Sequence, residues 1–390
     1  LVGIHEKANE NNTVITAASD VFNKRRDFAM AKANLKDADV YVDYRKMLEN
    51  KDIDVVIIGT PDHWHCLMLC DSLAAGKHAY VEKPIGNTIA EINIMQNAVK
   101  KTGKMVQVGQ WQRSQPHFVD AINFVKSGKL GRIRATKAWS FVDWKGPVPK
   151  VPDSPVPQGV DYNMWLGPAP QKPYHPDTVH FYWRGLWDYG TGAMGDMGAH
   201  IYDAPLWALN LEYPTKIQAT STPYNSEYLP LAQTVTYEFP ERFSPGIGYM
   251  PPVKVKWTDG GLLPERPEKL EPGRRVGTVF YGDKGIMMGG NAQMPSLVPA
   301  DADFKGPDPW LERTGDIFED WIGAIVNGKK ACNDFSWAAR VTEIMLLTNI
   351  AVLTQRFNTT LEYDGKNMKI TNLPEANNFF HYEYRKGWTL

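Results

Sequence analysis

Asp196 and His200 have the side chains and the spacing of a proton-transfer pair. They are four residues apart, at the end of a glycine-rich stretch that runs from Trp187 to Asp203. At the start of a helix this spacing would put both side chains on one face, with Cβ atoms about 5–6 Å apart. A carboxylate beside an imidazole fixes the ring tautomer and raises its basicity, as a general base requires. The alternative is a helix N-terminus with an acidic first turn and a core histidine.

Lys83 is a second residue whose position suggests chemistry. It lies in the tripeptide Glu82-Lys83-Pro84, directly after a predicted strand over residues 78–81. Pro84 cannot continue that strand and fixes the direction in which the chain leaves it. An ammonium group there could stabilise the alkoxide that forms as hydride departs from a hydroxyl-bearing carbon. A solvated loop lysine is the simpler alternative, and no phosphate-cofactor pattern supports a Schiff-base lysine.

The composition limits the classes of protein that this chain can belong to. Its 43 basic and 44 acidic residues give no electrostatic case for binding nucleic acid or an anionic membrane surface. No apolar run reaches the roughly 18 residues of a membrane span. Cys66, Cys70 and Cys332 are too few for a disulfide framework. Tryptophan and tyrosine cluster between Trp111 and Trp257, where such rings suit sugars but also ordinary cores.

The first part of the chain alternates short apolar runs with helical patterns. We expect strands over residues 14–20, 40–44, 53–59, 78–81 and 105–108, and helices over residues 25–33, 45–50, 63–75 and 88–102. This alternation predicts a parallel sheet with βαβ crossovers, in which ligands bind at the carboxyl ends of the strands. Those ends carry Asp20, Thr60, Pro61, Asp62, His63, Glu82, Lys83 and Gln110.

Asp20 ends the first predicted strand, where a Rossmann fold binds the adenosine ribose. The glycine-rich phosphate loop should lie about 20 residues earlier, so we expect that loop and the first strand to precede Leu1. Residues 1–12 would then end an amphipathic helix, and any export signal would lie further upstream, which leaves the location open. Asp20 favours NAD, because a carboxylate repels a 2′-phosphate. Arg25 and Arg26 could bind that phosphate, so NADP stays open.

The glycines Gly190, Gly192 and Gly195 match the letters G-x-G-x-x-G. No apolar strand precedes them, and no strand ending in an acid follows at the expected distance. We interpret these glycines as room for a substrate rather than as a phosphate loop.

The second part of the chain predicts an open, mostly antiparallel sheet. Strands are expected over residues 133–141, 214–222, 234–239, 253–259, 278–281 and 285–288, and helices over residues 117–127, 315–326 and 336–355. A proline-rich loop spans residues 146–158, and the aromatic tail after Thr371 could wrap a neighbouring subunit. We therefore expect a dinucleotide-binding domain over residues 1–112 and an α+β domain for substrate and oligomer contacts over residues 113–390, with the late helices packing back.

Three motifs, TPDHWH at 60–65, EKP at 82–84 and D-x-G-x-H at 196–200, resemble those of the Gfo/Idh/MocA family of nicotinamide-dependent sugar and polyol oxidoreductases. The resemblance covers nearly the whole chain. It implies that Lys83 touches the nicotinamide ribose and the reacting hydroxyl, that Glu82 places Lys83, and that the helix with Asp196 and His200 faces the nicotinamide. It also implies a cofactor groove lined by the TPDHWH turn and its neighbours at the sheet edge: Asp20, Thr60, Pro61, His63, His65 and Gln110.

A metal site is the alternative for His63 and His65, but side chains two residues apart on a helix splay by about 200°. No metal is expected. Five residues in segments that would border the cleft are candidate substrate contacts, with a structural role as the alternative for each: Arg113, Trp165, Trp183, Arg184 and Tyr189.

The expected activity is NAD-dependent oxidation of a secondary hydroxyl of a sugar or glycoside, with His200 as base, Asp196 orienting it and Lys83 stabilising the oxyanion. The same residues would serve an NAD-retaining glycoside hydrolase that works by transient oxidation, elimination, hydration and re-reduction. A non-catalytic sugar sensor is a third hypothesis. The resemblance further implies a homo-oligomer, a dimer or tetramer formed through the C-terminal sheet.

Overall fold

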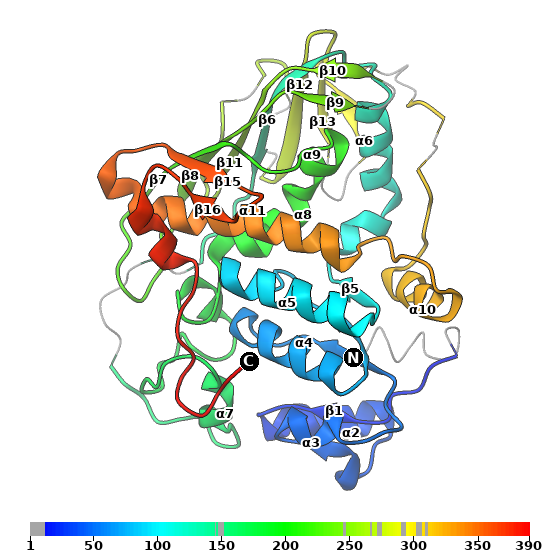
Figure 1. Ribbon diagram of the computed structural model, residues 1–390, viewed down its shortest axis with the longest axis vertical. Coiled ribbons are helices and arrows are strands. Elements are labelled where there is room, and N and C mark those ends of the chain that lie inside the picture. Colours follow the sequence, from blue (N-terminus) through cyan, green and yellow to red (C-terminus); the bar gives the residue numbers. More distant parts are fainter. Residues whose placement is uncertain are drawn as a thin grey trace.

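The computed structural model describes residues 12–144, 146, 152–244, 247–265, 267–270, 275–289, 294–301, 306–308 and 311–390. Within these residues the chain forms a parallel α/β lobe and a lobe built on a large sheet, and the long helix α11 (Phe335–Thr354) lies between them (Figure 1). The helix expected over residues 1–12 falls almost wholly outside the described residues.

The parallel lobe contains the alternation that its sequence predicts. Strands β3 (Val55–Ile58), β4 (His78–Val81) and β5 (Val106–Val108) pair in parallel in that order. Helices α4 (His65–Ala74) and α5 (Ile89–Thr102) make the crossovers. Helix α5 begins where expected because Thr88 and Glu91 form a capping box.

The strand expected over residues 14–20 is much shorter in the structure. Strand β1 comprises only Ala18–Ser19, which pairs in parallel with β2 (Val40–Tyr41). A strand needs a hydrogen-bonded neighbour, and the described residues give residues 14–17 none. The pair β1–β2 and the sheet β3–β5 are thus separate, and helices α2 (Asn23–Ala33) and α3 (Tyr44–Leu48) flank the pair.

The second lobe confirms the prediction of an open, mostly antiparallel sheet. Its strand order is β14-β13-β12-β6-β11-β8-β7-β15-β16, and the pair β6–β11 is parallel while the others are antiparallel. The nine strands are β6 (Ile133–Trp139), β7 (Lys216–Ser221), β8 (Gln233–Phe239), β11 (Val253–Thr258), β12 (Gly277–Gly282), β13 (Ile286–Gly289), β14 (Ser296–Leu297), β15 (Leu361–Asp364) and β16 (Lys369–Ile370). Strands β9 (Arg242–Ser244) and β10 (Gly248–Met250) form a separate hairpin. Residues of β8 are alternately buried and half-buried, as expected for a sheet covered on one face.

The helical segments of the second part of the chain include α6 (Pro116–Lys126), α7 (Tyr162–Leu166), the π-helical turn η5 (Met194–Gly198), α8 (Ala199–Ile201), α9 (Asp203–Ala208) and α10 (Ile317–Asn327). Together with α11 they connect the sheet to the parallel lobe.

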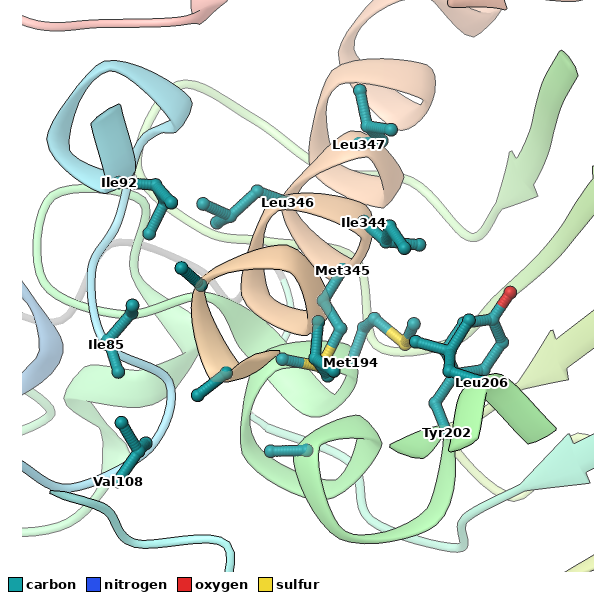
Figure 2. Close-up of a cluster of buried hydrophobic side chains, with 14 of the residues drawn as sticks. Ile85, Ile92, Val108, Met194, Tyr202, Leu206, Ile344, Met345, Leu346 and Leu347 are labelled. Carbon is teal, nitrogen blue, oxygen red and sulfur yellow. The ribbon is translucent and has the colours of Figure 1, made fainter. Parts of the chain in front are cut away.

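Helix α11 is the core helix that joins the two lobes. By length and composition its segment Phe335–Phe357 could cross a membrane, with a mean hydropathy of 1.2, but 78% of the apolar window is buried in the fold. Figure 2 shows Leu346 pointing towards Ile92 of α5, while Met345 lies beside Met194 of the π-helical turn. The helix therefore packs simultaneously against the parallel lobe and the segment that carries Asp196.

The C-terminal tail packs against its own chain. The hydroxyl groups of Tyr384 and Tyr382 donate to the Glu91 carboxylate of α5 at 2.7 and 3.3 Å. The ring of Trp388 meets that of Trp64 edge to face, with centroids 5.0 Å apart. The Arg385 guanidinium donates to the Gly167 carbonyl at 3.0 Å. The aromatic residues of the tail therefore contribute to the fold of their own chain.

Candidate active site

A cleft of about 840 Å³ opens at the carboxyl ends of β1 and β3. Ligands bind at this edge in parallel α/β sheets, because the loops that follow the strands converge there. The parallel lobe contributes Asp20, Thr60, Pro61, Asp62, Glu82 and Lys83 to the lining, and the second lobe contributes Trp165, Phe181, Trp183 and Arg184.

Lys83 and Asp196 form the central contact of this site. The Lys83 ammonium donates to the main-chain oxygen of Asp196 at 2.7 Å and to its carboxylate at 2.9 Å, and both side chains are largely buried. The same carboxylate lies 3.6 Å from Nε of Arg184. Asp196 therefore holds the lysine between the two lobes.

The structure corrects the expected pairing of Asp196 with His200. Asp196 lies in the π-helical turn Met194–Gly198, and His200 lies in the α-helical turn that follows. A π-turn closes its hydrogen bonds at i→i+5, so the one-face argument for residues four apart does not apply across it. The described contacts of the carboxylate are with Lys83 and Arg184, and those of His200 are with Gln112 and Trp111.

Gln112 is the residue that orients the His200 ring. Its amide oxygen is in hydrogen-bond contact with Nδ1 of His200. Because that oxygen only accepts, Nδ1 must carry the hydrogen, and Nε2 keeps a lone pair that can take a proton. Burial lowers the pKa of His200 well below its usual range, and the charge of Lys83 acts in the same direction, so the ring is neutral near pH 7. The sequence reasoning missed Gln112, although its place just after β5, at the carboxyl edge, was a signal.

Two carboxyl groups, those of the half-buried Glu82 and the buried Asp62, lie near Lys83 in the cleft lining. Burial raises the pKa of Glu82, and the charge of Lys83 opposes that shift. Gly109 leaves room for the Glu82 carboxylate, since a Cβ there would lie 2.5 Å from Oε2. Asp62, which the sequence placed at the carboxyl edge of the sheet, accepts a hydrogen bond from Thr191 at 2.9 Å, and burial raises its pKa to about 7.

His63 and His65 lie behind the wall of the cleft rather than on its surface. Nε2 of His63 is 3.1 Å from the Trp165 carbonyl, and His65 lies between the carbonyl groups of Pro84 and Thr60 at 2.7 and 2.9 Å. Burial lowers the pKa of each ring to about 4. Neither ring, expected from the sequence to contact the cofactor, is among the residues that line the cleft, and their described contacts are with the loops around it. Among the described residues there is no cluster of three or more metal-ligating side chains.

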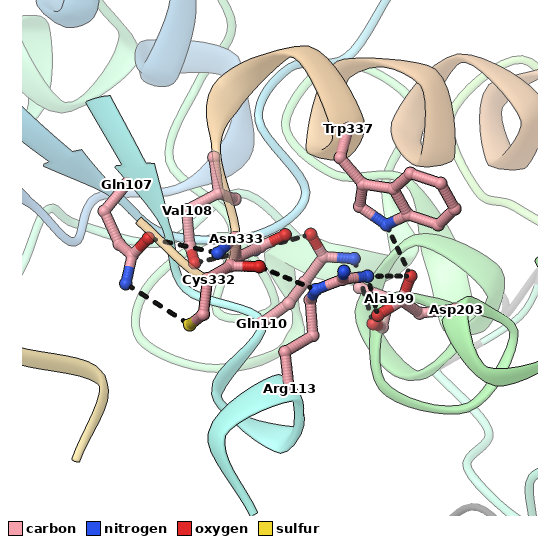
Figure 3. A network of polar contacts seen from close by, with 9 residues as sticks. All are labelled: Gln107, Val108, Gln110, Arg113, Ala199, Asp203, Cys332, Asn333 and Trp337. Carbon is pink, nitrogen blue, oxygen red and sulfur yellow. Dashed lines mark hydrogen bonds and ion pairs between the residues drawn. The ribbon is translucent and has the colours of Figure 1, made fainter. Parts of the chain in front are cut away.

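Gln110 and Arg113 also lie inside the protein, at the junction of the lobes (Figure 3). Gln110 donates to the Ala199 carbonyl at 3.2 Å and so supports the turn that carries His200. Arg113 forms a buried ion pair with Asp203 at 3.1 Å. Neither residue lines the cleft, so the expected cofactor contact of Gln110 and substrate contact of Arg113 are replaced by structural contacts.

The remaining substrate candidates divide into two groups. Trp165, Trp183 and Arg184 line the cleft, as expected. Tyr189 is only 1% exposed, and its ring packs on Trp165 with centroids 4.9 Å apart, behind the cleft surface. Its expected contact with substrate is therefore corrected to support of Trp165.

The glycines before the π-helical turn make room for the chain itself rather than for a substrate. A Cβ at Gly190 would lie 2.5 Å from Cα of Arg184. At Gly195 it would lie 1.8 Å from Oγ1 of Thr191. These close approaches hold Arg184 and Thr191 against the turn that carries Asp196.

The cleft residues fit a dinucleotide. Asp20 lies at the end of β1, where its carboxylate could accept from ribose hydroxyls, and burial raises its pKa against the opposing effects of Phe22, Arg25 and Arg26. Oγ1 of Thr60 is buried and has no hydrogen-bond partner among the described residues, which leaves it available to a ligand. Lys83 supplies a cation at the far end of the same edge.

Known proteins share parts of this sequence. Levoglucosan dehydrogenase of Pseudarthrobacter phenanthrenivorans is 28% identical over 162 residues, 41% of this chain and 34% of that protein. Inositol 2-dehydrogenase of Salmonella typhimurium is 32% identical over 119 residues, 30% of this chain and 35% of that protein. Glycosyl hydrolase family 109 protein 1 of Shewanella sp. is 33% identical over 90 residues, 23% of this chain and 20% of that protein. The chain thus spans about a third or less of the length of these relatives.

The fold is similar to that of solved structures along most of the chain. Levoglucosan dehydrogenase in complex with NADH and levoglucosan has a TM-score of 0.59 at 17% identity, covering 87% of this chain and 89% of that chain. The WlbA dehydrogenase from Bordetella pertussis in complex with NADH and UDP-GlcNAcA has a TM-score of 0.62 at 16% identity, covering 93% and 94%. At these identities the likeness concerns the fold alone.

Two family models match the sequence itself. The NAD-binding Rossmann fold of an oxidoreductase family matches residues 4–110, and the C-terminal alpha/beta domain of the same family matches residues 95–242. Together with the three motifs and the cleft at the sheet edge, these matches establish the family to which the chain belongs. The chain belongs to the Gfo/Idh/MocA family of oxidoreductases, and its parallel lobe is the family's NAD-binding domain.

Proposed function

We propose that this protein is an NAD-dependent oxidoreductase that oxidises a secondary alcohol of a sugar or glycoside, removing the proton from the hydroxyl oxygen and the hydride from the carbon that bears it. The observation that carries the proposal is the contact of Lys83, which lines the cleft, with Asp196. The charge of Lys83 also acts on the ring of His200, although neither Asp196 nor His200 is among the lining residues. A cation and a proton acceptor side by side are what alcohol oxidation needs.

His200 is the proposed proton acceptor. Gln112 holds Nδ1 as the protonated nitrogen, so Nε2 is the atom that takes the hydroxyl proton. The nearby positive charge of Lys83 stabilises the alkoxide oxygen that this transfer creates. For reduction of the ketone, the proton moves in the opposite direction.

Asp20, Thr60, Pro61 and Glu82 are the residues proposed to hold the dinucleotide along the sheet edge. NAD held there would supply the hydride acceptor for the alcohol carbon. The aromatic rings of Trp165 and Trp183 cover the cleft from the second lobe and exclude water from the reacting groups.

The test follows NADH absorbance with a panel of sugars and glycosides, for the wild type and for Lys83→Met and His200→Gln. Each variant should lose about 100-fold or more in kcat while NAD affinity changes little. The exposed Lys100→Met serves as the matched control and should keep the wild-type rate. Sugar binding without turnover by the wild type would instead support a sugar sensor.

An oxidative glycoside hydrolase is the second candidate, and the similarity to a glycosyl hydrolase family 109 protein favours it. There the oxidised carbon acidifies the neighbouring C–H bond, the aglycone leaves by elimination, water adds to the double bond, and the ketone is reduced again. The electrons return to the sugar, so glycoside cleavage would proceed without net NADH. Measuring aglycone release and absorbance in the same reaction separates this activity from simple dehydrogenation.

We also propose that the outer face of the nine-stranded sheet joins copies of this chain. That face carries Lys216, Gln218, Thr220, Thr236 and Lys254, which are partly or fully exposed. Light scattering of the purified protein should give a dimer or tetramer. Thr236→Arg should shift the mass towards the monomer, and an unchanged mass would contradict this surface.

A further inference from the structure

Phe181 is a large aromatic residue that stays open to solvent on the wall of the cleft. Its side chain lines the cleft, and the residue is 59% exposed. Its neighbour Trp183 lines the same cleft but is only 6% exposed. The cleft thus has an aromatic face that the protein itself leaves uncovered.

Neighbouring rings hold Phe181 in place. Trp144, itself 8% exposed, meets Phe181 edge to face with centroids 5.2 Å apart. The Arg184 guanidinium lies 4.2 Å from the Trp183 ring centroid, 5.4 Å from that of Trp144 and 5.8 Å from that of Phe181. Since these contacts fix the ring before any ligand binds, little side-chain entropy remains to be lost on binding.

Arg184 connects this aromatic group to the reacting end of the site. Its Nε lies 3.6 Å from the Asp196 carboxylate, and the same carboxylate contacts Lys83 at 2.9 Å. The side chain of Arg184 therefore lies between Phe181 and the Lys83–Asp196 pair, to which the function is assigned. If the reacting hydroxyl lies at Lys83, a substituent of the sugar that extends past Arg184 reaches the Phe181 ring.

We propose that Phe181, supported by Trp144, is a subsite for a second ring of the substrate, so that the preferred substrates are glycosides rather than free monosaccharides or single-ring polyols. The inference rests on the proposed function and narrows its substrate class. The chemistry recognised is a flat six-membered ring: the C–H face of a pyranose or the face of an aryl aglycone, either of which packs on an exposed aromatic ring.

The experiment compares one-ring and two-ring ligands on the full chain with NAD. The one-ring probes are methyl β-D-glucoside and methyl β-D-galactoside. The two-ring probes are cellobiose and lactose for a sugar ring, and the p-nitrophenyl β-D-glucoside and galactoside for an aryl ring. Turnover is followed by both NADH absorbance and aglycone release, and binding is followed by calorimetry in parallel.

Phe181→Ala should lower kcat/KM and affinity for the two-ring probes by about tenfold, with less than a twofold change for the methyl glycosides. Phe181→Tyr should restore most of the loss. The control is Phe243→Ala, which removes an aromatic residue that is 71% exposed outside the cleft lining and should change neither class. If Phe181→Ala lowers kcat/KM more for the disaccharides, the subsite binds a sugar ring. If it lowers kcat/KM more for the p-nitrophenyl glycosides, the subsite binds an aryl ring.

Equal effects of Phe181→Ala on one-ring and two-ring probes would overturn the subsite and leave the proposed function standing. Ring-dependent binding without turnover of any probe would retain the subsite and overturn the proposed function. Failure of every probe to bind the wild type would overturn both.

Discussion

The Lys83 ammonium and the Asp196 carboxylate, 113 residues apart in sequence, lie 2.9 Å apart across the junction of the two lobes. The lysine leaves the sheet edge of the NAD-binding domain, and the aspartate comes from a π-helical turn of the second domain. This contact holds the Lys83 ammonium where both lobes border the cleft.

Asp196→Asn should lower kcat by about 10- to 100-fold, because Lys83 loses its anionic anchor. Lys83→Met should lower it at least as much. Since the two residues act as one unit, the double variant should be no slower than Lys83→Met alone. Steady-state kinetics of the three variants form the cycle, and additive losses would show that Asp196 acts on another group.

Gln112→Glu should move the acid limb of the pH–rate profile to higher pH. A carboxylate beside Nδ1 stabilises the protonated imidazole, so His200 would become charged and inactive as a base at a higher pH than in the wild type. In the wild type the lowered pKa keeps the base active to well below pH 6.5. The pH dependence of kcat/KM measures the shift, and Gln218→Glu on the outer sheet face is the control. If Gln112→Glu leaves the acid limb of the kcat/KM profile at the same pH, that limb reflects the titration of a group other than His200.

Asp62→Asn should change how stability depends on pH. The pKa of Asp62 is raised from 3.8 to about 7 by burial, so ionising it costs more in the folded than in the unfolded protein. Its contribution therefore destabilises the fold progressively as the pH rises from about 4 to about 7, and stays constant above that. The asparagine variant should gain roughly 2–4 kcal/mol relative to the wild type between pH 4 and pH 8. Thermal unfolding at both values tests this, and parallel profiles for the two proteins would refute it.

Arg385→Ala should destabilise the protein by about 2–3 kcal/mol. The guanidinium donates to the Gly167 carbonyl at 3.0 Å and to the side-chain and main-chain oxygens of Asn163 at 2.8 and 3.0 Å, so it ties the C-terminal tail to the segment that carries Trp165. Urea unfolding measures the loss, with the exposed Arg356→Ala as the control. Equal midpoints for the two variants would show that the tail adds no stability.

The sequence by itself determined the order of the elements and the edge at which the site forms. Apolar runs between helical patterns predict parallel strands, and the polar residues after those runs converge wherever such strands end. The sequence therefore places Thr60, Glu82 and Lys83 at the edge where the cleft forms. The length of the strand predicted over residues 14–20 is too great, because a local pattern does not show which residues have a strand to pair with.

Only the tertiary structure decided which side chains face the cleft and which partner each of them has. Asp196 pairs with Lys83, and His200 with Gln112, because a π-helical turn separates two residues that a regular helix would bring together. His65, Gln110, Arg113 and Tyr189 lie on the predicted segments but turn towards carbonyl groups, a buried carboxylate or other rings. The physical reason is that a side chain's direction is set by its packing in the folded chain, and the partners of Lys83, Gln110, Gln112 and Arg113 lie 88 to 113 positions away, where no local spacing encodes them.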